Sequence, residues 1–471
     1  MQSAAIDAAY YAAMEIPSAL AHSVAEETPR NAQDKNGAKA GNGGPLVLPT
    51  SPSKGTNGKL GMTGSNPLAD EHLLGDWAGI RTGLQDMGIS LSAQYLLHGV
   101  YNLNGGTDSG FRQAGQASLG ATFDLDRMIG VKKAVIQLLI LNRNGDNLST
   151  DKRLFLLQPA QGIYGRGEVW RLTQFWYRQT IGKVEYKIGR VSLSEDFATA
   201  PCIFENGTFC GTAPGNILGY YWYNSPVSEW GARVRLYDGR KGYFQLGLYE
   251  VNPSNLRDDK GFNLSFKGCT GVMIPIEKAW AVRLGGDPRR AGLYKIGAWY
   301  DTSRATDLVR DVDGGMAALS GRPLEKKRGR YGAYAAFRQQ IVAPDAEGAG
   351  GFNMFLNAVQ GDRRTAPLLN KFAVGAFYSG LIPGRPTDEI GLAIGRTRSN
   401  GRLARMHAAW NEMARDNVPI RRSEYAAELD YIIYPLPGLT LRPNLQLVVH
   451  PAGRSDRKSI VIAGFSALTS F

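Results

Sequence analysis

Residues 89–97, Ile89-Ser90-Leu91-Ser92-Ala93-Gln94-Tyr95-Leu96-Leu97, alternate between apolar and polar side chains. One face carries Ile89, Leu91, Ala93, Tyr95 and Leu97, and the other carries Ser90, Ser92 and Gln94. A period of two places neighbouring side chains on opposite faces, so the pattern predicts a β-strand with one apolar and one polar face. Before Ile89 the spacing is helical instead, through Trp77, Ile80, Leu84 and Met87. We expect one short amphipathic helix there, with Asp76 capping its start and Gly88 its end.

The alternation recurs to the end of the chain, for example in 117–125, 425–433 and 461–467, and leads to the terminal Phe471. We count about sixteen such segments, near 89–101, 115–126, 133–144, 169–181, 183–190, 231–238, 242–251, 270–284, 292–303, 330–342, 352–361, 371–380, 388–398, 423–434, 439–449 and 459–471. The apolar faces carry aromatic residues near their ends, and the opposite faces are polar and often charged.

The connections between these segments alternate in length. Short links are 127–132, 182, 238–241 and 435–438, and long ones are 145–168, 191–230, 302–329 and 399–422. Short turns on one rim and long loops on the other are typical of outer-membrane barrels. A soluble β-sandwich would need a second apolar layer, whereas the opposite faces here are polar. We predict an all-β fold: a transmembrane antiparallel β-barrel of about sixteen strands with short periplasmic turns and long extracellular loops.

Three regions follow from these patterns: a signal-like or disordered linker over 1–68, the N-terminal helix over 69–88 and the barrel over 89–471.

The longest apolar run, 134–141, is far shorter than a membrane-spanning helix needs, which excludes a helical membrane protein. Three cysteines cannot staple a chain of 471 residues, so a disulfide scaffold is excluded too.

The net charge of +12 raises the question of nucleic-acid binding. The basic residues fall in short bursts within expected loops, at 289–290, 326–330, 363–364 and 421–422, rather than on one helix face. We therefore predict no nucleic-acid partner.

The chain also has no nucleophile or metal-protease motif, and its five histidines have no metal-ligand spacing. We predict no enzyme activity, no metal and no cofactor.

The segment Leu73-Leu74-Gly75-Asp76-Trp77-Ala78-Gly79-Ile80-Arg81 resembles the leader motif of the carbohydrate-selective porin (OprB) family of Gram-negative bacteria, in which a second Gly stands at the position of Ala78. Further similar stretches are Trp176-Tyr177-Arg178-Gln179, Ile188-Gly189-Arg190, Asp196-Phe197, Trp230-Gly231-Ala232-Arg233 and Leu441-Arg442-Pro443-Asn444-Leu445-Gln446 with the terminal Phe. The resemblance covers about 73–471. The long linker before Leu73 and the two cysteines of the loop 191–230 depart from the family pattern.

The resemblance implies an outer-membrane channel for passive uptake of glucose and related sugars, in contact with outer-membrane lipid and assembled as a homotrimer. Two other functions stay open. The +12 charge would also suit a general or anion-preferring porin. A barrel whose loops plug its lumen would not transport at all. Reversal potentials and the presence of any conductance distinguish the three.

A sugar channel needs polar groups on the water-facing parity of its strands. Arginine suits this role because its planar fork donates to neighbouring hydroxyls. The candidates on that parity are Arg143, Gln174, Trp176, Arg178, Arg233, Arg235 and Arg338, with Glu424, Glu428 and Asp430 across the barrel. Trp176 could stack on a pyranose. We expect Arg143 and Arg178 to form the basic half of a constriction. Arg190 falls on the lipid-facing parity, so we expect it at the rim or past a bulge.

The loop 191–230 is unusually long, and in porin-like barrels such a loop folds into the lumen. Glu195, Asp196 and Glu205 would then face the basic wall and create a transverse field. Residues 220–223, Tyr-Tyr-Trp-Tyr, could line this constriction or instead pack beneath the loop or at the membrane interface. Cys202 and Cys210 lie eight residues apart and suggest a local disulfide, although Cys269 leaves other pairings open.

The terminal aromatic residue generates a first prediction. Phe471 closes the apolar row of the last strand, and barrels of this kind present such a residue to the outer-membrane insertion machinery. We expect deletion of Phe471 to leave unfolded protein in the periplasm, measured by cell fractionation and heat-dependent gel mobility. Wild-type levels of folded, membrane-inserted protein would contradict this role.

Overall fold

The computed structural model describes residues 72–200, 202–239, 241–345 and 348–471. The predicted linker over 1–68 lies outside these residues. The strands are β1 (Ile89–Asn102), β2 (Gly110–Asp124), β3 (Ala134–Gly145), β4 (Trp170–Ile181), β5 (Val184–Val191), β6 (Glu229–Tyr237), β7 (Gly242–Val251), β8 (Gly271–Arg283), β9 (Ala291–Asp311), β10 (Leu324–Val342), β11 (Phe352–Gln360), β12 (Leu368–Ser379), β13 (Glu389–Ser399), β14 (Ser423–Leu436), β15 (Leu439–Val449) and β16 (Ile460–Ser470).

Short helices occupy the connections between the strands. They are α3 (Ile80–Asp86), α4 (Leu125–Ile129), α5 (Leu148–Asp151), α6 (Leu193–Asp196), α7 (Ala213–Leu218), α8 (Ala317–Ser320) and α9 (Gly401–Ala414), with the 3₁₀ turns η1 (Pro253–Leu256), η2 (Asp258–Lys260), η3 (Leu284–Gly286) and η4 (Pro451–Gly453). No helix in the described part of the chain is long and apolar enough to cross a bilayer.

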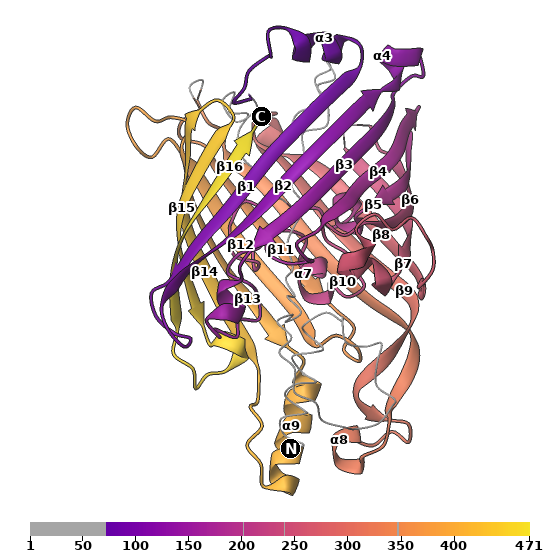
Figure 1. Ribbon diagram of the computed structural model, residues 1–471, viewed down its shortest axis with the longest axis vertical. Helices are drawn as coiled ribbons and strands as arrows, with labels where there is room; N and C mark the ends of the chain where they lie inside the picture. The colour runs from indigo at the N-terminus through magenta and orange to yellow at the C-terminus, as the bar shows by residue number, and fades with distance from the viewer. Residues whose placement is uncertain (1–71, 201, 240, 346–347) are drawn as a thin grey trace.

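Each strand pairs with its neighbours in sequence, and β1 pairs with β16, so the sheet closes on itself (Figure 1). All sixteen pairings are antiparallel. Closure leaves no strand edge unpaired, as a sheet surrounded by lipid requires. The predicted sixteen-stranded antiparallel barrel is confirmed.

The pairing of the strands puts their polar faces inside the barrel and their apolar faces outside, as the alternation in the sequence predicted. In β5 and β6, Lys187 lies opposite Arg233 and both are buried inside the barrel. Their neighbours Ile188 and Val234 point outward and are 55% and 52% exposed. Large apolar side chains that are exposed on the outer wall of a closed barrel form its lipid-facing surface.

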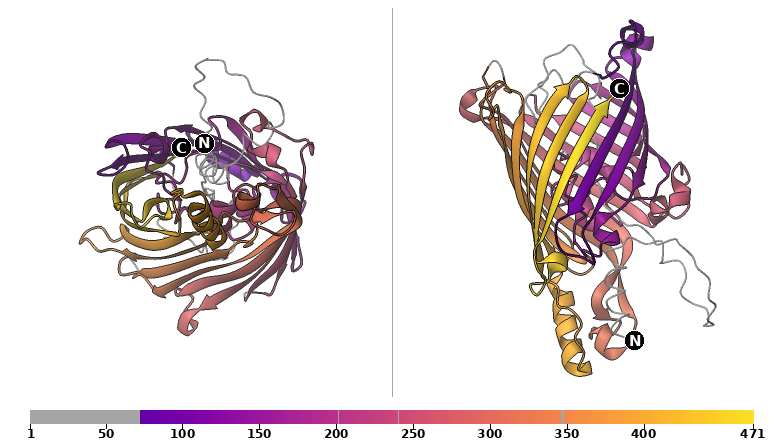
Figure 2. Two further views of the ribbon diagram at one scale, coloured as in Figure 1. Left: turned by 90° about the horizontal axis from the view of Figure 1, so that it is seen from below. Right: turned by 60° about the vertical axis from the view of Figure 1, so that its left-hand side comes forward.

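The two rims of the barrel differ as expected (Figure 2). The short-turn rim is the end where β2 is joined to β3, β4 to β5 and β14 to β15, and the long-loop rim is the end where β3 is joined to β4, β5 to β6 and β13 to β14. One predicted long loop was wrong in detail, and a second contains a helix. Residues 302–329 are largely strand, because β9 continues to Asp311 and β10 begins at Leu324. Residues 399–422 contain the helix α9. This helix packs beside the extended hairpin through Arg402, whose guanidinium pairs with both oxygens of Asp307 at 2.8 and 3.1 Å.

The N-terminal helix is shorter than its pattern predicted. Gly79 adopts a left-handed φ of 92°, so α3 starts at Ile80, while Asp76 accepts hydrogen bonds from the N–H and hydroxyl of Thr82. Its apolar residues do not pack into a core: Ile80 is 61% exposed. The buried residue is Arg81, which donates to a terminal main-chain oxygen of Phe471 at 2.8 Å. The helix is therefore attached to the barrel seam through a polar contact.

Arg190 lies at the end of β5, at the long-loop rim, and its side chain is 2% exposed. Its guanidinium donates to the carbonyl of Ser228 at 2.6 Å and lies 3.5 Å from the carboxylate of Glu250. The loop after β7 covers this outer face, because Trp230, opposite Arg190 in register, donates to the carbonyl of Leu264. The cost of an outward-facing arginine is thus offset at the rim by a carboxylate and a covering loop.

Candidate channel constriction

The loop between β5 and β6 folds into the barrel, and its helix α7 lies within the barrel outline (Figure 1). It reaches the opposite wall, where Lys371 of β12 donates to the carbonyl of Gly207 at 3.1 Å. Trp222 is fully buried, and its ring lies 5.0 Å from that of Trp299 and 5.9 Å from that of Tyr334. Tyr221 and Tyr223 are each 1% exposed. Most of the 220–223 aromatic cluster therefore packs beneath the loop and does not line an open path.

Asp196 fixes the start of this loop to the basic wall. One carboxylate oxygen lies 3.2 Å from Lys187 and 3.3 Å from Arg233, and the other accepts from the hydroxyl of Tyr249 at 2.8 Å. Burial alone would raise the pKa of Asp196, but Lys187 and Arg233 lower it to about 2. The side chain is 4% exposed, so Asp196 acts as a charged anchor and not as a contact for solutes.

Glu195 shares Lys187 with Asp196 but retains solvent contact. Its carboxylate pairs with Lys187 at 2.6 Å and accepts from the amide of Gln174 at 2.8 Å, while 19% of the side chain stays exposed. Lys187 also lies 4.2 Å from the ring centroid of Trp176, which is 5% exposed. A cation already occupies one face of this buried indole. Trp176 is therefore not the sugar-stacking platform that its position in the sequence suggested.

The predicted arginines divide into buried and accessible groups. Arg233 is 3% exposed and pairs with Glu185 at 2.6 Å, which makes it a structural ion-pair member. Arg235 keeps 20% of its side chain exposed and lies 4.2 Å above the ring of Tyr243. Arg178 on β4 and Arg338 on β10 are half-buried on the water-facing side. The groups that reach the lumen are thus Glu195 with Arg178, Arg235 and Arg338.

Arg143 and Arg178 do not form one half of a constriction as expected. Arg178 lies opposite Val135 at the start of β3, whereas Arg143 lies near the other end of that strand. Arg143 is 2% exposed and donates to the side chain of Gln116 at 2.9 Å and to the carbonyl of Ser225 at 3.1 Å. It holds the end of the inserted loop. Both side chains are on the inward-facing side of their strands, but they lie at different depths along the barrel.

The acidic residues of the opposite wall also hold loops. Glu428 accepts the backbone N–H groups of Glu205 and Asn206 at 2.7 and 2.8 Å. Glu424 accepts those of Leu157 and Ala452. Both glutamates are buried, which agrees with this anchoring role and removes them from direct contact with solutes.

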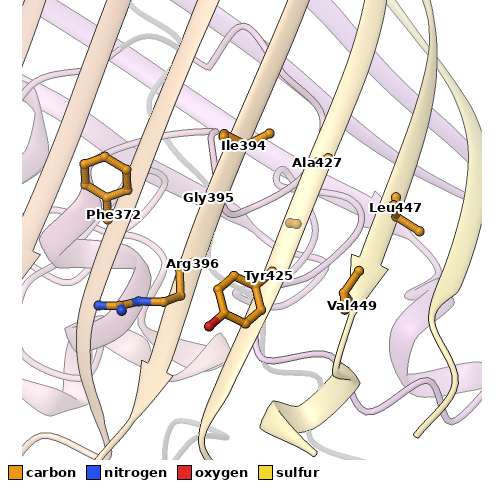
Figure 3. A pocket seen from close by; sticks show the side chains of 9 residues that line it. Phe372, Ile394, Gly395, Arg396, Tyr425, Ala427, Leu447 and Val449 are labelled. Carbon is orange, nitrogen blue, oxygen red and sulfur yellow. The ribbon is translucent and has the colours of Figure 1, made fainter. Parts of the chain in front are cut away.

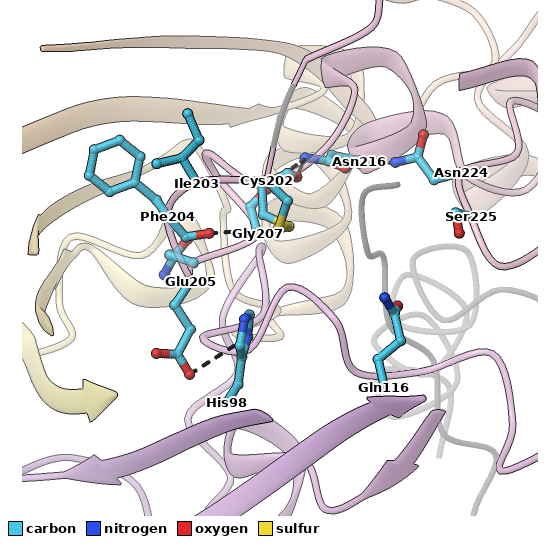
Figure 4. Close-up of a disulfide and its surroundings, with 12 residues drawn as sticks. His98, Gln116, Cys202, Ile203, Phe204, Glu205, Gly207, Asn216, Asn224 and Ser225 are labelled. Carbon is cyan, nitrogen blue, oxygen red and sulfur yellow. Dashed lines mark hydrogen bonds and ion pairs between the residues drawn. A yellow bond between two sulfur atoms is a disulfide. The ribbon is translucent and has the colours of Figure 1, made fainter. Parts of the chain in front are cut away.

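A disulfide joins Cys202 to Cys210 and closes the loop tip beside β1 and β15 (Figure 4). Within the tip, Glu205 lies 3.7 Å from Nδ1 of His98 and accepts from Asn444 at 2.5 Å. Burial and the neighbouring Glu428 raise the pKa of Glu205 well above its usual range. Cys269 is exposed and does not take part in the bridge.

Several lumen groups were not predicted from the sequence. Lys187 lies on the same parity as Glu185, and Lys295 donates to the carbonyl of Thr199 in the inserted loop at 3.0 Å. Arg442 and Asn444 follow the inward parity of β15 and contact the loop tip at Ile203 and Glu205. Alternation in the sequence marks all four as inward-facing. Lys187, Lys295 and Asn444 were left out because arginines and carboxylates were preferred, whereas Arg442 met that criterion and was overlooked.

Comparison with known proteins identifies the class of barrel. Residues 108–471 match the model of the carbohydrate-selective porin, OprB family. Porin B of Pseudomonas aeruginosa is 35% identical over 414 residues, which cover 85% of this chain and 91% of that protein. The putative porin QuiX of Acinetobacter baylyi is 33% identical over 419 residues, covering 85% and 93%. The chain belongs to the OprB family of carbohydrate-selective porins.

A solved structure supports the same assignment. The high-pH structure of OprB from Pseudomonas putida has a TM-score of 0.82 and 35% identity, covering 85% of this chain and 98% of that one. The protein is therefore a carbohydrate channel of the Gram-negative outer membrane, and its class is that of a channel rather than an enzyme. Since short turns face the periplasm in such barrels, the long-loop rim is extracellular.

The anchoring role of Asp196 generates a prediction. In Asp196→Asn, Lys187 and Arg233 each lose one buried counter-charge but keep Glu195 and Glu185, so the cost stays below the about 3–5 kcal/mol of a buried pair that is broken outright. We expect the start of the loop to loosen while the barrel stays folded, because no strand pairing involves this side chain. Planar-bilayer recordings should show a larger and noisier single-channel conductance.

Glu195→Gln serves as the matched control. Its carboxylate lies one residue away, is partly exposed and can be replaced by an amide that still accepts from Gln174. We expect a smaller conductance change in this variant. Equal conductance in Asp196→Asn and wild type would show that the remaining contacts hold the loop without Asp196.

Proposed function

We propose that the channel selects small neutral sugars, glucose and related monosaccharides, between Glu195 on the inserted loop and the arginines of the basic wall. The supporting observation is that the accessible lumen groups combine fixed donors, Arg178, Arg235 and Arg338, with one fixed acceptor. A sugar hydroxyl both donates and accepts hydrogen bonds. A solute with hydroxyls on several sides can therefore exchange its water for both kinds of wall group.

The ion pairs behind the accessible groups keep their positions fixed. Lys187 is shared between Glu195 and Asp196, and Glu185 is shared between Arg233 and Arg235. Arg235 is further held by the side chain of Gln245 at 2.8 Å. Fixed dipoles and charges lose little free energy to reorganisation when a solute passes. Passage is passive and down the concentration gradient, since binding that is weak and multiple allows exit as well as entry.

The alternative of an anion-preferring porin has one observation in its favour. Three partly accessible arginines face one accessible carboxylate, Glu195, in the inserted-loop region that we assign to the constriction. We therefore propose a modest anion preference in addition to sugar passage. This preference should weaken with salt, because exposed charges are screened within about 8 Å at physiological ionic strength.

We propose a homotrimer in outer-membrane lipid, inserted through recognition of Phe471, with 69–88 as an N-terminal segment and 89–471 as the barrel. Phe471 donates its N–H to the carbonyl of Ala93 at 2.9 Å, which places the terminal residue at the β1–β16 seam. Sedimentation of the detergent-purified protein measures the oligomeric state.

The double substitution Arg178→Gln and Arg338→Gln tests whether these wall arginines select sugars and favour anions. A charge-assisted hydrogen bond contributes about 1.5–3 kcal/mol when desolvated and far less in a wet pore. We expect a lower ratio of glucose to disaccharide flux in liposome swelling, and a reversal potential shifted toward cation permeation. Barrel stability should be unchanged, because both side chains lie on the water-facing side of the sheet and the strand pairing does not depend on them.

Two controls separate selection from loop anchoring. Arg304→Gln removes an exposed arginine from the extended part of β9 and should leave flux and reversal potential unchanged. Arg143→Gln should raise conductance through loss of the Ser225 contact. An unchanged flux ratio in the double variant, together with a shifted reversal potential, would make the two arginines solvated wall charges and overturn their role in sugar selection.

A further inference from the structure

The outer wall carries a groove on the lipid-facing side of β12–β15. Its volume is about 500 Å³. The residues that line it are Phe372, Ile394, Gly395, Arg396, Tyr425, Ala426, Ala427, Leu447 and Val449 (Figure 3). Small residues form its floor, while Ile394, Tyr425 and Leu447 are each more than 40% exposed along its sides. The groove is therefore an apolar depression open to the bilayer and separate from the lumen.

One end of the groove is basic. Arg396 lies between Phe372 and Tyr425 in Figure 3, and its guanidinium donates to the side chain of Asn370 at 3.0 Å. Its Nε atom is buried without a hydrogen-bond partner among the described residues. Arg398, two residues further on the same outward parity, is exposed, and so is Arg422 at the adjoining rim. Within the described residues no carboxylate forms an ion pair with Arg396 or Arg398.

The basic end lies at a definite depth in the membrane. β13 runs from the short-turn rim at Glu389 to the long-loop rim at Ser399, so Arg396 is three residues from the extracellular end. At about 3.4 Å per residue this is within roughly 10 Å of the rim. An outward arginine costs about 2–4 kcal/mol at the bilayer midplane but about 0–1 kcal/mol near the interface. Arg396 and Arg398 thus lie where lipid headgroups of the outer leaflet are found.

We propose that this groove is a binding site for a phosphorylated glycolipid of the outer leaflet. An acyl chain occupies the apolar depression against Ile394 and Leu447, and a headgroup phosphate lies against Arg396 and Arg398. A planar guanidinium can donate two parallel hydrogen bonds to phosphate oxygens, and Arg398 presents an exposed guanidinium next to that of Arg396. Tyr425, supported by the ring of His450 at 6.0 Å, borders the junction between chain and headgroup.

Charge favours a lipid over a second copy of this chain as the occupant. Cores of protein–protein interfaces are depleted in charged residues, because each unpaired charge is costly to desolvate. A partner covering this groove would bury Arg396 and Arg398 with no carboxylate beside them on this chain. A phosphate supplies the missing negative charge and leaves the rest of the headgroup in water.

The test uses the full chain purified in detergent, with lipid retention measured by native mass spectrometry. The probes are diphosphorylated lipid A, its dephosphorylated form and phosphatidylglycerol. We expect the wild type to retain diphosphorylated lipid A in preference to the other two. The pair Arg396→Gln and Arg398→Gln should lower its apparent affinity about tenfold or more, as loss of charge-assisted hydrogen bonds implies.

A second variant examines the apolar part without changing charge. Ala427→Trp fills the depression and should lower retention of diphosphorylated lipid A while heat-dependent mobility confirms a folded barrel. Arg304→Gln, an exposed arginine on β9 remote from the groove, is the control and should bind as wild type does.

Several outcomes would overturn the proposal. Equal retention of lipid A by wild type and the double arginine variant would remove the basic end from recognition. Equal or stronger binding of the dephosphorylated lipid or of phosphatidylglycerol would show that a phosphorylated glycolipid is not selected. An oligomer that dissociates in Ala427→Trp would assign the groove to a second copy of the chain.

Discussion

The pairing of β1 with β16 is the contact on which the rest of the protein depends. Nine residue pairs, from Gln94 opposite Ser470 to Asn102 opposite Ile462, join strands that lie at the two ends of the barrel sequence. In hydrocarbon each unpaired backbone group costs several kcal/mol, so an open sheet would not be stable there. Closure satisfies these groups and creates a water-filled interior at the same time. The polar residues of alternate positions are tolerated because that interior exists.

The interior in turn allows a long loop to be held by strand carboxylates. Glu229 accepts the N–H of Leu193, Glu277 that of Ala198, and Glu428 those of Glu205 and Asn206. Each contact satisfies backbone donors that the inserted loop could not pair with a strand. Buried backbone groups need such partners, and a carboxylate forms stronger hydrogen bonds than a neutral acceptor. The acidic residues of the wall therefore act mainly on loop position, and through it on the width of the channel.

The alternation of side chains was sufficient to predict the fold, and it also predicted which face each residue occupies. It could not predict the role of a residue on the water-facing side. Glu428 and Arg143 have the right parity for a pore but bond to loop backbone, and Trp176 is covered by Lys187. These contacts come from a segment far away in sequence, whose path inside the barrel carries no periodic signal. The position of a residue in the alternation determines whether its side chain points into the barrel. Whether that side chain is exposed to the channel depends on what the inserted loop covers.

The pairing of basic side chains with carboxylates can be compared between the lumen and the outer wall. Inside, Lys187, Arg233 and Arg235 pair with Glu195, Asp196 and Glu185, three cations with three carboxylates, so this part of the wall contributes little net field. The net field of the channel therefore depends on the other half-buried arginines of the wall, Arg178 and Arg338. On the outside, Arg190 is neutralised by Glu250 beneath a loop, whereas Arg396 has no such carboxylate. Arginines of equal formal charge thus differ in effect according to their pairing and their exposure. Arg233, which is buried against a carboxylate, holds structure together, whereas Arg235 and Arg398 keep solvent exposure and so retain charge that is available to a solute, a lipid or water.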